Sequence, residues 1–326
     1  MIRAAAVLPL TGRYRHLAMD SARGLAAWAV DAGARLTIED CGEHAAEAGR
    51  AAQELAPDVD VFFGPYGSGA MRAVAAALSG SEVVVWNHGG AAVEHAGARV
   101  VDVLAPAERY WFGLGDVLVA DGLDPERVAV VHAPSGFGLA VAHGAIASLG
   151  TAGAQPLVVR AFDATTAADA VRAAQAAGAV AIIGCGRFED DIALGTALRG
   201  TPMAVGLVAC GVDAAAAELG AEVVGWFGPC QWLADERSQG VLEAGLDYPA
   251  AQAYACGQVA QQAIAAAGTA AAAAVWDAVR QLSTTTLLGR FAVDADGRQM
   301  GLTPHIVRWQ EGVGGPVRQV VWRAQG

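Results

Sequence analysis

The sequence predicts an α/β protein with two lobes, each built on a parallel sheet that carries helices on both faces. Short apolar strands alternate with helices along most of the chain, a pattern typical of parallel sheets. The alternation runs twice, once on either side of about residue 106, and 326 residues are enough for two separate cores. Hydrophobic residues make up 54% of the chain and charged residues 17%, which indicates a folded globular protein.

The first series of elements runs from the N-terminus to Pro106. Apolar runs predict strands at residues 4–8, 35–39, 59–63, 82–86 and 100–104. Amphipathic spacing predicts helices at residues 17–31 and 44–55, and a third that begins at Ser68. Ala32 and Gly33 end the first of these helices.

The second series begins with a predicted helix at residues 108–120. Strands are expected at residues 128–132, 157–162, 179–184, 203–208 and 223–227, with helices that end at Leu149 and that cover 166–177, 189–198 and 213–219. Three helices then follow at 237–246, 249–267 and 270–282, and strands return at 291–293, 305–310 and 317–322. Residues 294–297 lack the later ligands of a calcium loop, so we expect a hairpin turn there.

Composition excludes several functional classes. The net charge of −12 argues against a nucleic acid or an anionic membrane as partner. The chain contains no lysine, which excludes P-loop and Schiff-base lysines, and no apolar run is long enough to suggest a membrane span. The five cysteines are scattered without metal-ligand spacing, so neither a metal nor a cofactor is expected. Their odd number favours a reducing compartment, and residues 1–10 read as a strand, so the chain is either cytosolic or has lost a leader.

Residues 59–78 form the stretch around which the chain is organised. An apolar strand leads into a turn that contains Gly64, Gly67 and Gly69, and a helix follows directly. The first N–H groups of that helix lie at the positive end of its dipole, and Ser68 adds a hydroxyl there. Ser68 either binds a carboxylate at this place or caps the helix.

Other loops at the carboxyl ends of strands add candidates. Ligands of open α/β sheets bind beyond these ends. If the two lobes face each other, one cleft is lined by five loops: Thr11-Gly12, Gly67-Ser68, Asn87-His88-Gly89, Ser135-Gly136-Phe137 and Gly186-Arg187.

The order of several short motifs resembles the type I periplasmic solute-binding proteins of the branched-chain amino-acid type, with their amide, urea and aromatic-acid relatives. Residues 7–12 (VLPLTG) match the opening of that family, and residues 63–68 (FGPYGS) match its second-strand loop. Residues 128–131 with Phe137-Gly138 match the family's strand that is followed by Tyr or Phe and then Gly. Ala253-Tyr254 with residues 289–297 match its C-terminal third.

The resemblance implies two Rossmann-like lobes joined by three crossovers, near Ala105, Leu233 and Leu287, that close on a small ligand by hinge bending. Lobe 1 would then comprise residues 1–105 and 234–287, and lobe 2 residues 106–233 and 288–326. The implied ligand-binding residues, with those of the surrounding loops, are Thr11, Tyr14, Leu17, Tyr66, Gly67, Ser68, Asn87, His88, Gly89, Gly90, Phe137, Arg187 and Val208.

Two departures from the family pattern bear on the ligand. Amino-acid binders place an acidic residue where this chain has Val208, so an ordinary α-amino acid is not expected, because its buried ammonium would lack a partner. Arg187 replaces an aromatic residue, and its guanidinium either binds a carboxylate or pairs with Glu189 or Asp190. Trp86 and Trp226 either stack on the ligand or fill the core. We therefore expect a ligand with a carboxylate or amide group, and an aromatic ring is one of the alternatives.

Two functions remain open, and both are non-enzymatic. The chain either delivers its ligand to the permease of an ABC importer from outside the cytoplasm, or is a cytosolic sensor that regulates a partner protein. An enzyme is not expected. The dinucleotide fingerprint is absent after the first strand, Tyr66 stands where a nucleophile elbow needs glycine, and His16, His88 and His132 show no triad spacing.

Overall fold

The computed structural model describes residues 1–95, 97–234, 241–243 and 245–324, and these form two compact units. Unit 1 comprises Met1–Pro106 and Trp232–Leu302, and unit 2 comprises Ala107–Gln231 and Thr303–Gly326. Each unit carries its own sheet, so the predicted two-lobe α/β architecture is confirmed.

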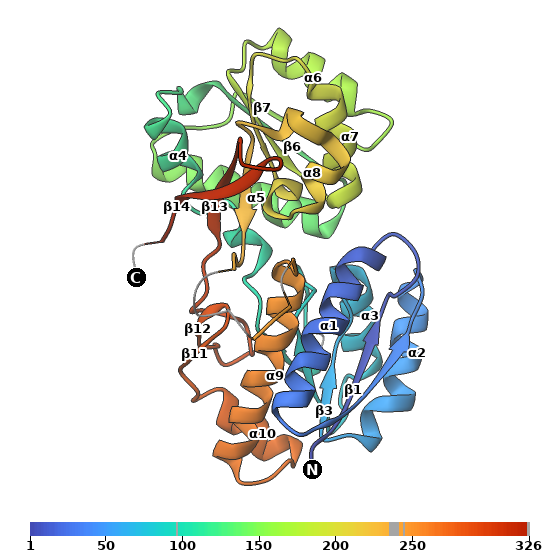
Figure 1. Cartoon of the computed structure of the whole chain (residues 1–326). Coiled ribbons are helices and arrows are strands. Elements are labelled where there is room, and N and C mark those ends of the chain that lie inside the picture. Colours follow the sequence, from blue (N-terminus) through green and yellow to red (C-terminus); the bar gives the residue numbers. More distant parts are fainter. Residues whose placement is uncertain (96, 235–240, 244, 325–326) are drawn as a thin grey trace. The chain divides into compact units, whose positions relative to one another are not determined.

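Unit 1 is built on a five-stranded parallel sheet (Figure 1). The strand order is β2-β1-β3-β4-β5. The strands are β1 (Arg3–Leu8), β2 (Arg35–Asp40), β3 (Val61–Phe63), β4 (Val84–Asn87) and β5 (Arg99–Asp102). The helices are α1 (Arg15–Asp31), α2 (Ala45–Leu55), α3 (Ser68–Ala77), α9 (Tyr248–Ala267) and α10 (Ala272–Val279), and β11 (Thr284–Thr286) pairs with β12 (Gly289–Phe291).

Helices cover the unit 1 sheet on both faces because its strands are apolar on both sides. Helices α2 and α3 pack on Ala5, Phe62 and Val85, which belong to one buried cluster. Helices α1 and α9 run side by side, as Figure 1 shows. A Cβ atom at Gly257 of α9 would lie 2.3 Å from Cγ of Trp28 on α1, so glycine allows this close approach.

Unit 2 is built on a seven-stranded sheet of order β14-β13-β10-β9-β8-β6-β7. Its strands are β6 (Val128–His132), β7 (Val158–Ala161), β8 (Ala181–Cys185), β9 (Ala204–Leu207), β10 (Phe227–Cys230), β13 (His305–Gln310) and β14 (Val317–Trp322). Its helices are α4 (Leu114–Ala120), α5 (Gly136–Thr151), α6 (Ala167–Ala176), α7 (Phe188–Leu198) and α8 (Ala214–Leu219). The sheet is mixed, because β13 runs antiparallel to both β10 and β14.

Several predicted elements of unit 2 differ from the structure. The strand expected at 223–227 is wrong: residues Gly220–Val223 form a 3-10 helix, and the strand lies at Phe227–Cys230. The helix expected at 108–120 begins only at Leu114, after a 3-10 turn at Ala107–Arg109. Gly113 interrupts it in the left-handed region (φ 92°), where the Trp322 ring occupies the space of a side chain.

Residues 232–302 also depart from the prediction in places. Residues 237–240 and 244 of the helix expected at 237–246 lie outside the described residues, and the described residues 241–243, 245 and 246 are not helical. The strand β11 was not predicted, whereas the turn at residues 294–297 is present, because the Asp294 carboxylate accepts hydrogen bonds from the N–H groups of Asp296 and Arg298. Residues 288–302, expected in lobe 2, belong to unit 1, where Gln299 donates to the Val103 carbonyl (3.1 Å).

No single helix among the described residues is long and apolar enough to cross a membrane. Helices α9 and α10 pass that test only as a pair bent by 107°.

Candidate functional site

The carboxyl ends of the unit 1 strands bring most of the candidate residues together. Strands β1, β3 and β4 are neighbours in the sheet and parallel, so the loops that follow Leu8, Phe63 and Asn87 leave the same edge. The loops also bond to each other: Gly64 N–H donates to the Trp86 carbonyl and Gly67 N–H to the Gly89 carbonyl, both at 2.9 Å. We call these three loops the loop cluster: hydrogen bonds join the loops after Phe63 and Asn87, and the Tyr14 ring in the loop after Leu8 has its centroid 6.1 Å from that of Tyr66.

Glycines allow the loop cluster to pack closely. Gly67 lies in the left-handed region (φ 99°), and a Cβ atom there would be 3.1 Å from Cε2 of Tyr14. A Cβ atom at Gly89 would be only 2.6 Å from the Cα atom of Tyr66. Larger residues at these positions would force the loops apart.

Ser68 does not cap its helix. It is the first residue of α3, and no side-chain cap bond is formed there. Its Oγ instead accepts a hydrogen bond from the Ala92 N–H (3.1 Å). A hydroxyl that accepts one bond can still donate its hydrogen, so Ser68 can offer that hydrogen to an acceptor group.

Ser68 is only 9% exposed, and the residue after it lies at the surface. Gly69 is exposed, and no atom lies within 4 Å of the position that a Cβ atom would take there. The first N–H groups of a helix have no partner within the helix, and they carry its positive dipole end. The hydroxyl and these N–H groups together suit a carboxylate.

The Asn87 side chain stabilises the loop that follows β4. Its side chain is fully buried and closes the turn by accepting from Gly89 N–H (3.2 Å) and Gly90 N–H (2.8 Å), while it donates to the Gly90 carbonyl (2.8 Å). A Cβ atom at Gly90 would be 2.7 Å from Cβ of Met71, so this turn packs against α3. Asn87 and the two glycines thus form the frame of the site.

His88 is fully buried, and burial lowers the pKa of its imidazole to about 4, although the nearby Gly64 backbone opposes part of this change. Within the described part of the chain, neither ring nitrogen has a hydrogen-bond partner of normal geometry. The ring is therefore neutral near pH 7, and it can donate one hydrogen bond and accept another.

The loop after β1 supplies a polar anchor and an aromatic wall. The Thr11 hydroxyl donates to the Asp40 carboxylate (2.9 Å), which also accepts from Leu10 N–H and Gly42 N–H. Burial raises the pKa of Asp40, but these hydrogen bonds outweigh it and the net shift is downward. The half-buried Tyr14 ring lies 6.1 Å from that of Tyr66, whereas Leu17 is buried.

Unit 2 carries the remaining candidates at the carboxyl edge of its own sheet. Phe137, near the start of α5, packs edge-on against Tyr110 with ring centroids 5.6 Å apart, and the Tyr110 hydroxyl accepts a bond from Gln231 (2.7 Å). Val208 follows β9 and is 8% exposed. Trp86 in unit 1 is buried, and Trp226 in unit 2 packs against a core cluster, so both fill cores.

Arg187 forms the ion pair that the sequence left as one of two alternatives. Its guanidinium donates to both carboxylate oxygens of Asp190, from Nε at 2.7 Å and from the second nitrogen at 3.1 Å. Such a bidentate pair fixes the side chain at the start of α7. The next residue, Asp191, is fully buried and accepts from the Ala209 N–H (2.9 Å), which ties α7 to the loop that contains Val208.

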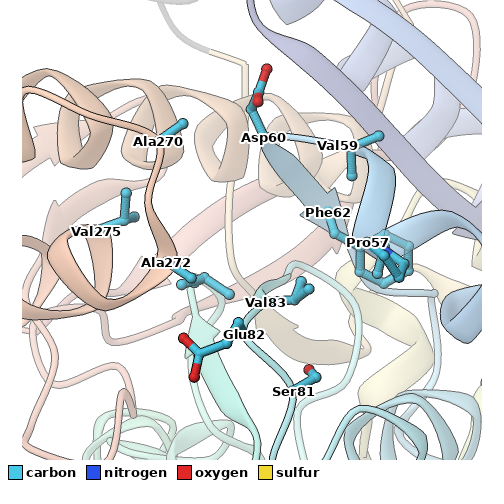
Figure 2. Close-up of a pocket in the computed structure, with 12 residues that line it drawn as sticks. Pro57, Val59, Asp60, Phe62, Ser81, Glu82, Val83, Ala270, Ala272 and Val275 are labelled. Atoms are coloured by element: carbon cyan, nitrogen blue, oxygen red, sulfur yellow. The ribbon is translucent and has the colours of Figure 1, made fainter.

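A cavity of about 250 Å³ lies at the other end of the unit 1 strands, where β3 and β4 begin (Figure 2). It is lined by residues that precede or begin β3 and β4, such as Asp60 and Glu82, and by Ala270, Ala272 and Val275. These are the amino ends of the strands, so the cavity is separate from the candidate loops. Among the described residues, no group of three or more His, Cys, Asp or Glu side chains could hold a metal ion.

Sequence reasoning missed the partners that organise these loops. Ala92 holds Ser68, Asp40 holds Thr11, and Asp102 accepts a bond from Asn87 Nδ2 (2.6 Å). Both aspartates are the last residues of strands, which is the one sequence signal that could have indicated them.

Several solved structures of solute-binding proteins are similar to this fold. A solute-binding protein of an ABC transporter from R. palustris, in complex with 4-hydroxybenzoate, superimposes with a TM-score of 0.87 at 14% identity, over 98% of this chain and 96% of that chain. A second solute-binding protein from R. palustris, in complex with benzoate, superimposes with a TM-score of 0.79 at 16% identity, over 98% of this chain and 95% of that chain. A leucine-binding protein from Thermotoga maritima gives 0.80 at 15% identity, over 99% of both chains.

These identities are low, so the superpositions show a common fold. No curated protein sequence matches the chain. The sequence model described as "Periplasmic binding protein" matches residues 1–314, which is nearly the whole chain. The chain therefore belongs to the periplasmic binding protein family, as its sequence motifs indicated.

Proposed function

We propose that this chain binds a small aromatic carboxylate without chemical conversion and delivers it to the permease of an ABC importer. One observation carries the proposal: Ser68 is the first residue of α3, and its hydroxyl accepts a bond from the Ala92 N–H, which leaves its hydrogen for donation. A carboxylate placed there would accept from this hydroxyl and from the first N–H groups of the helix. The other unit 1 candidates, from Thr11 to Gly90, form the walls and frame of this site.

Three features support an aromatic acid. The Tyr14 and Tyr66 rings lie beside the Gly67 turn, and aromatic rings favour stacked or edge-on partners. Val208 offers no charge to an ammonium group, which disfavours an ordinary α-amino acid. Two of the structural relatives were solved with 4-hydroxybenzoate and benzoate.

Phe137, Arg187 and Val208 of unit 2 are proposed as ligand-binding residues, as the family resemblance implies. Because Asp190 already holds Arg187, we propose that this arginine contributes less than Ser68. The family also supports a location outside the cytoplasm.

Isothermal titration calorimetry with benzoate, benzamide and leucine tests the proposal. We expect benzoate to bind, and its neutral isostere benzamide and leucine to bind much more weakly or not at all. Ser68→Ala should weaken benzoate binding by about 1–2 kcal/mol, because one charge-assisted hydrogen bond is lost. Recovery of unchanged benzoate after incubation, measured by chromatography, would agree with the absence of catalysis.

Ser81→Ala is the matched control, since it removes a hydroxyl from the same unit at the cavity of Figure 2. Its benzoate affinity should equal that of the wild type. Equal binding of benzoate and benzamide, or equal losses in both serine variants, would refute a carboxylate site at Ser68.

A further inference from the structure

A buried polar network links one candidate ligand loop to a distant part of unit 1. His95 Nε2 lies 3.0 Å from Oδ2 of Asp102, and its Nδ1 lies 2.7 Å from the backbone carbonyl oxygen of Asp296. The other oxygen of Asp102 accepts from Asn87 Nδ2 at 2.6 Å. The His95 and Asp102 side chains are only 10% and 13% exposed, so water screens this network weakly.

Both partners of His95 are acceptors. A carboxylate oxygen and a backbone carbonyl oxygen offer lone pairs and no hydrogen. A neutral imidazole has one N–H group and can bond only one of them, whereas the imidazolium has two and bonds both. The geometry therefore fits the charged form of His95.

The charged groups around His95 support the same form. Burial lowers the pKa of His95, but the hydrogen bond and charge of Asp102 and the Asp296 carbonyl outweigh it, while Arg298 opposes them, and the net shift is upward. On the side of α9, burial and the Asp102 charge raise the pKa of the Cys256 thiol, so that group stays neutral. His88 titrates only at about pH 4.

The network reaches the candidate site along two routes. Asp102 holds the Asn87 amide, whose three further bonds close the turn at residues 87–90. His95 also anchors the segment that contains Ala92, and the Ala92 N–H holds the Ser68 hydroxyl. When His95 loses its proton, it keeps only one of its hydrogen bonds to Asp102 and Asp296. The turn at residues 87–90 and the segment that contains Ala92 are then held less firmly.

The geometry points to His95 and Asp102 as a positioning pair for the ligand loop: protonated His95 orders residues 87–95 and thereby strengthens carboxylate binding at Ser68. This inference rests on the proposed function. Binding should be tightest while His95 is charged and should weaken as the pH rises through its pKa. By linkage, the ligand must in turn favour the protonated form.

The test is benzoate affinity measured by calorimetry from pH 6 to pH 9, a range in which a carboxylic acid of pKa about 4 stays ionised. For the wild type we expect affinity to fall by about fivefold or more, which is typical of coupling between sites. His95→Gln keeps a donor for Asp102 but does not titrate, so its affinity should be independent of pH. Asp102→Asn should weaken binding and also remove the pH dependence.

His44→Gln is the matched control, because His44 is an exposed histidine of the same unit. It should keep the wild-type pH profile. If His95→Gln or Asp102→Asn does not fold, the wild type alone still decides, through proton uptake on binding and the NMR titration of the His95 ring. Both should show that benzoate raises the His95 pKa.

The outcomes separate the two proposals. Absence of benzoate binding at every pH contradicts the proposed function. Binding with equal pH profiles in the wild type and His95→Gln, or a His95 pKa that benzoate does not change, overturns the positioning role and leaves the proposed function standing.

Discussion

Replacement of Asp191 by asparagine should change how the stability of unit 2 depends on pH. The carboxylate is fully buried on α7, and burial raises its pKa from the ordinary 3.8 to about 7, while the Ala209 N–H opposes the shift and the charge of Asp190 adds to it. Because the folded pKa exceeds the unfolded one, the folded state binds more protons between these values. The contribution of Asp191 to stability is therefore most favourable at low pH and falls as the pH rises from about 4 to about 7.

The magnitude follows from the difference between the two pKa values. The pKa is about 7 in the folded protein and 3.8 for the ordinary group. At about 1.4 kcal/mol for each pH unit, this difference lowers the free energy of unfolding by roughly 4 kcal/mol at neutral pH. Asp191→Asn keeps an oxygen that accepts from Ala209 N–H and removes this pH-dependent loss. Each kcal/mol moves the melting temperature of a unit of this size by about 2–4 °C.

The assay is differential scanning calorimetry of wild type and Asp191→Asn at pH 4, 5, 6, 7 and 8. The melting temperature of the variant should rise relative to the wild type as the pH increases, with most of the change between pH 4 and 7. Glu222→Gln, at an exposed site of the same unit, should show no such trend. A constant difference between Asp191→Asn and wild type at all pH values would refute the reasoning.

Two further substitutions test other contacts. Arg187→Ala leaves the buried Asp190 without its bidentate partner, so unit 2 should lose about 1–3 kcal/mol in denaturant unfolding, while benzoate affinity changes less than in Ser68→Ala. Gly257→Ala places a Cβ atom 2.3 Å from Cγ of Trp28, so circular dichroism should show unit 1 melting with a loss of about 1–3 kcal/mol or more, and an unchanged melting temperature would contradict the close approach of α1 and α9.

Local patterns were sufficient for most elements and for the fold class. The alternation of apolar strands and helices predicted both sheets, because each strand must be apolar to be buried between helix layers. The strand at Phe227–Cys230 was missed because Pro229 cannot donate a ladder hydrogen bond, which argues against a strand at sequence level. The helix predicted at 108–120 begins only at Leu114, because the Trp322 ring, which is distant in sequence, packs against Gly113.

The sequence by itself determined the two-lobe α/β class, the family, and the loops in which the candidates lie. Only the tertiary structure decided what each candidate contacts. Ser68 meets Ala92 across 24 residues, and His95 meets Asp296 across 201. Periodicity reports which face of an element is buried, but it carries no information about which polar atoms of distant segments meet, because that depends on strand order and loop path.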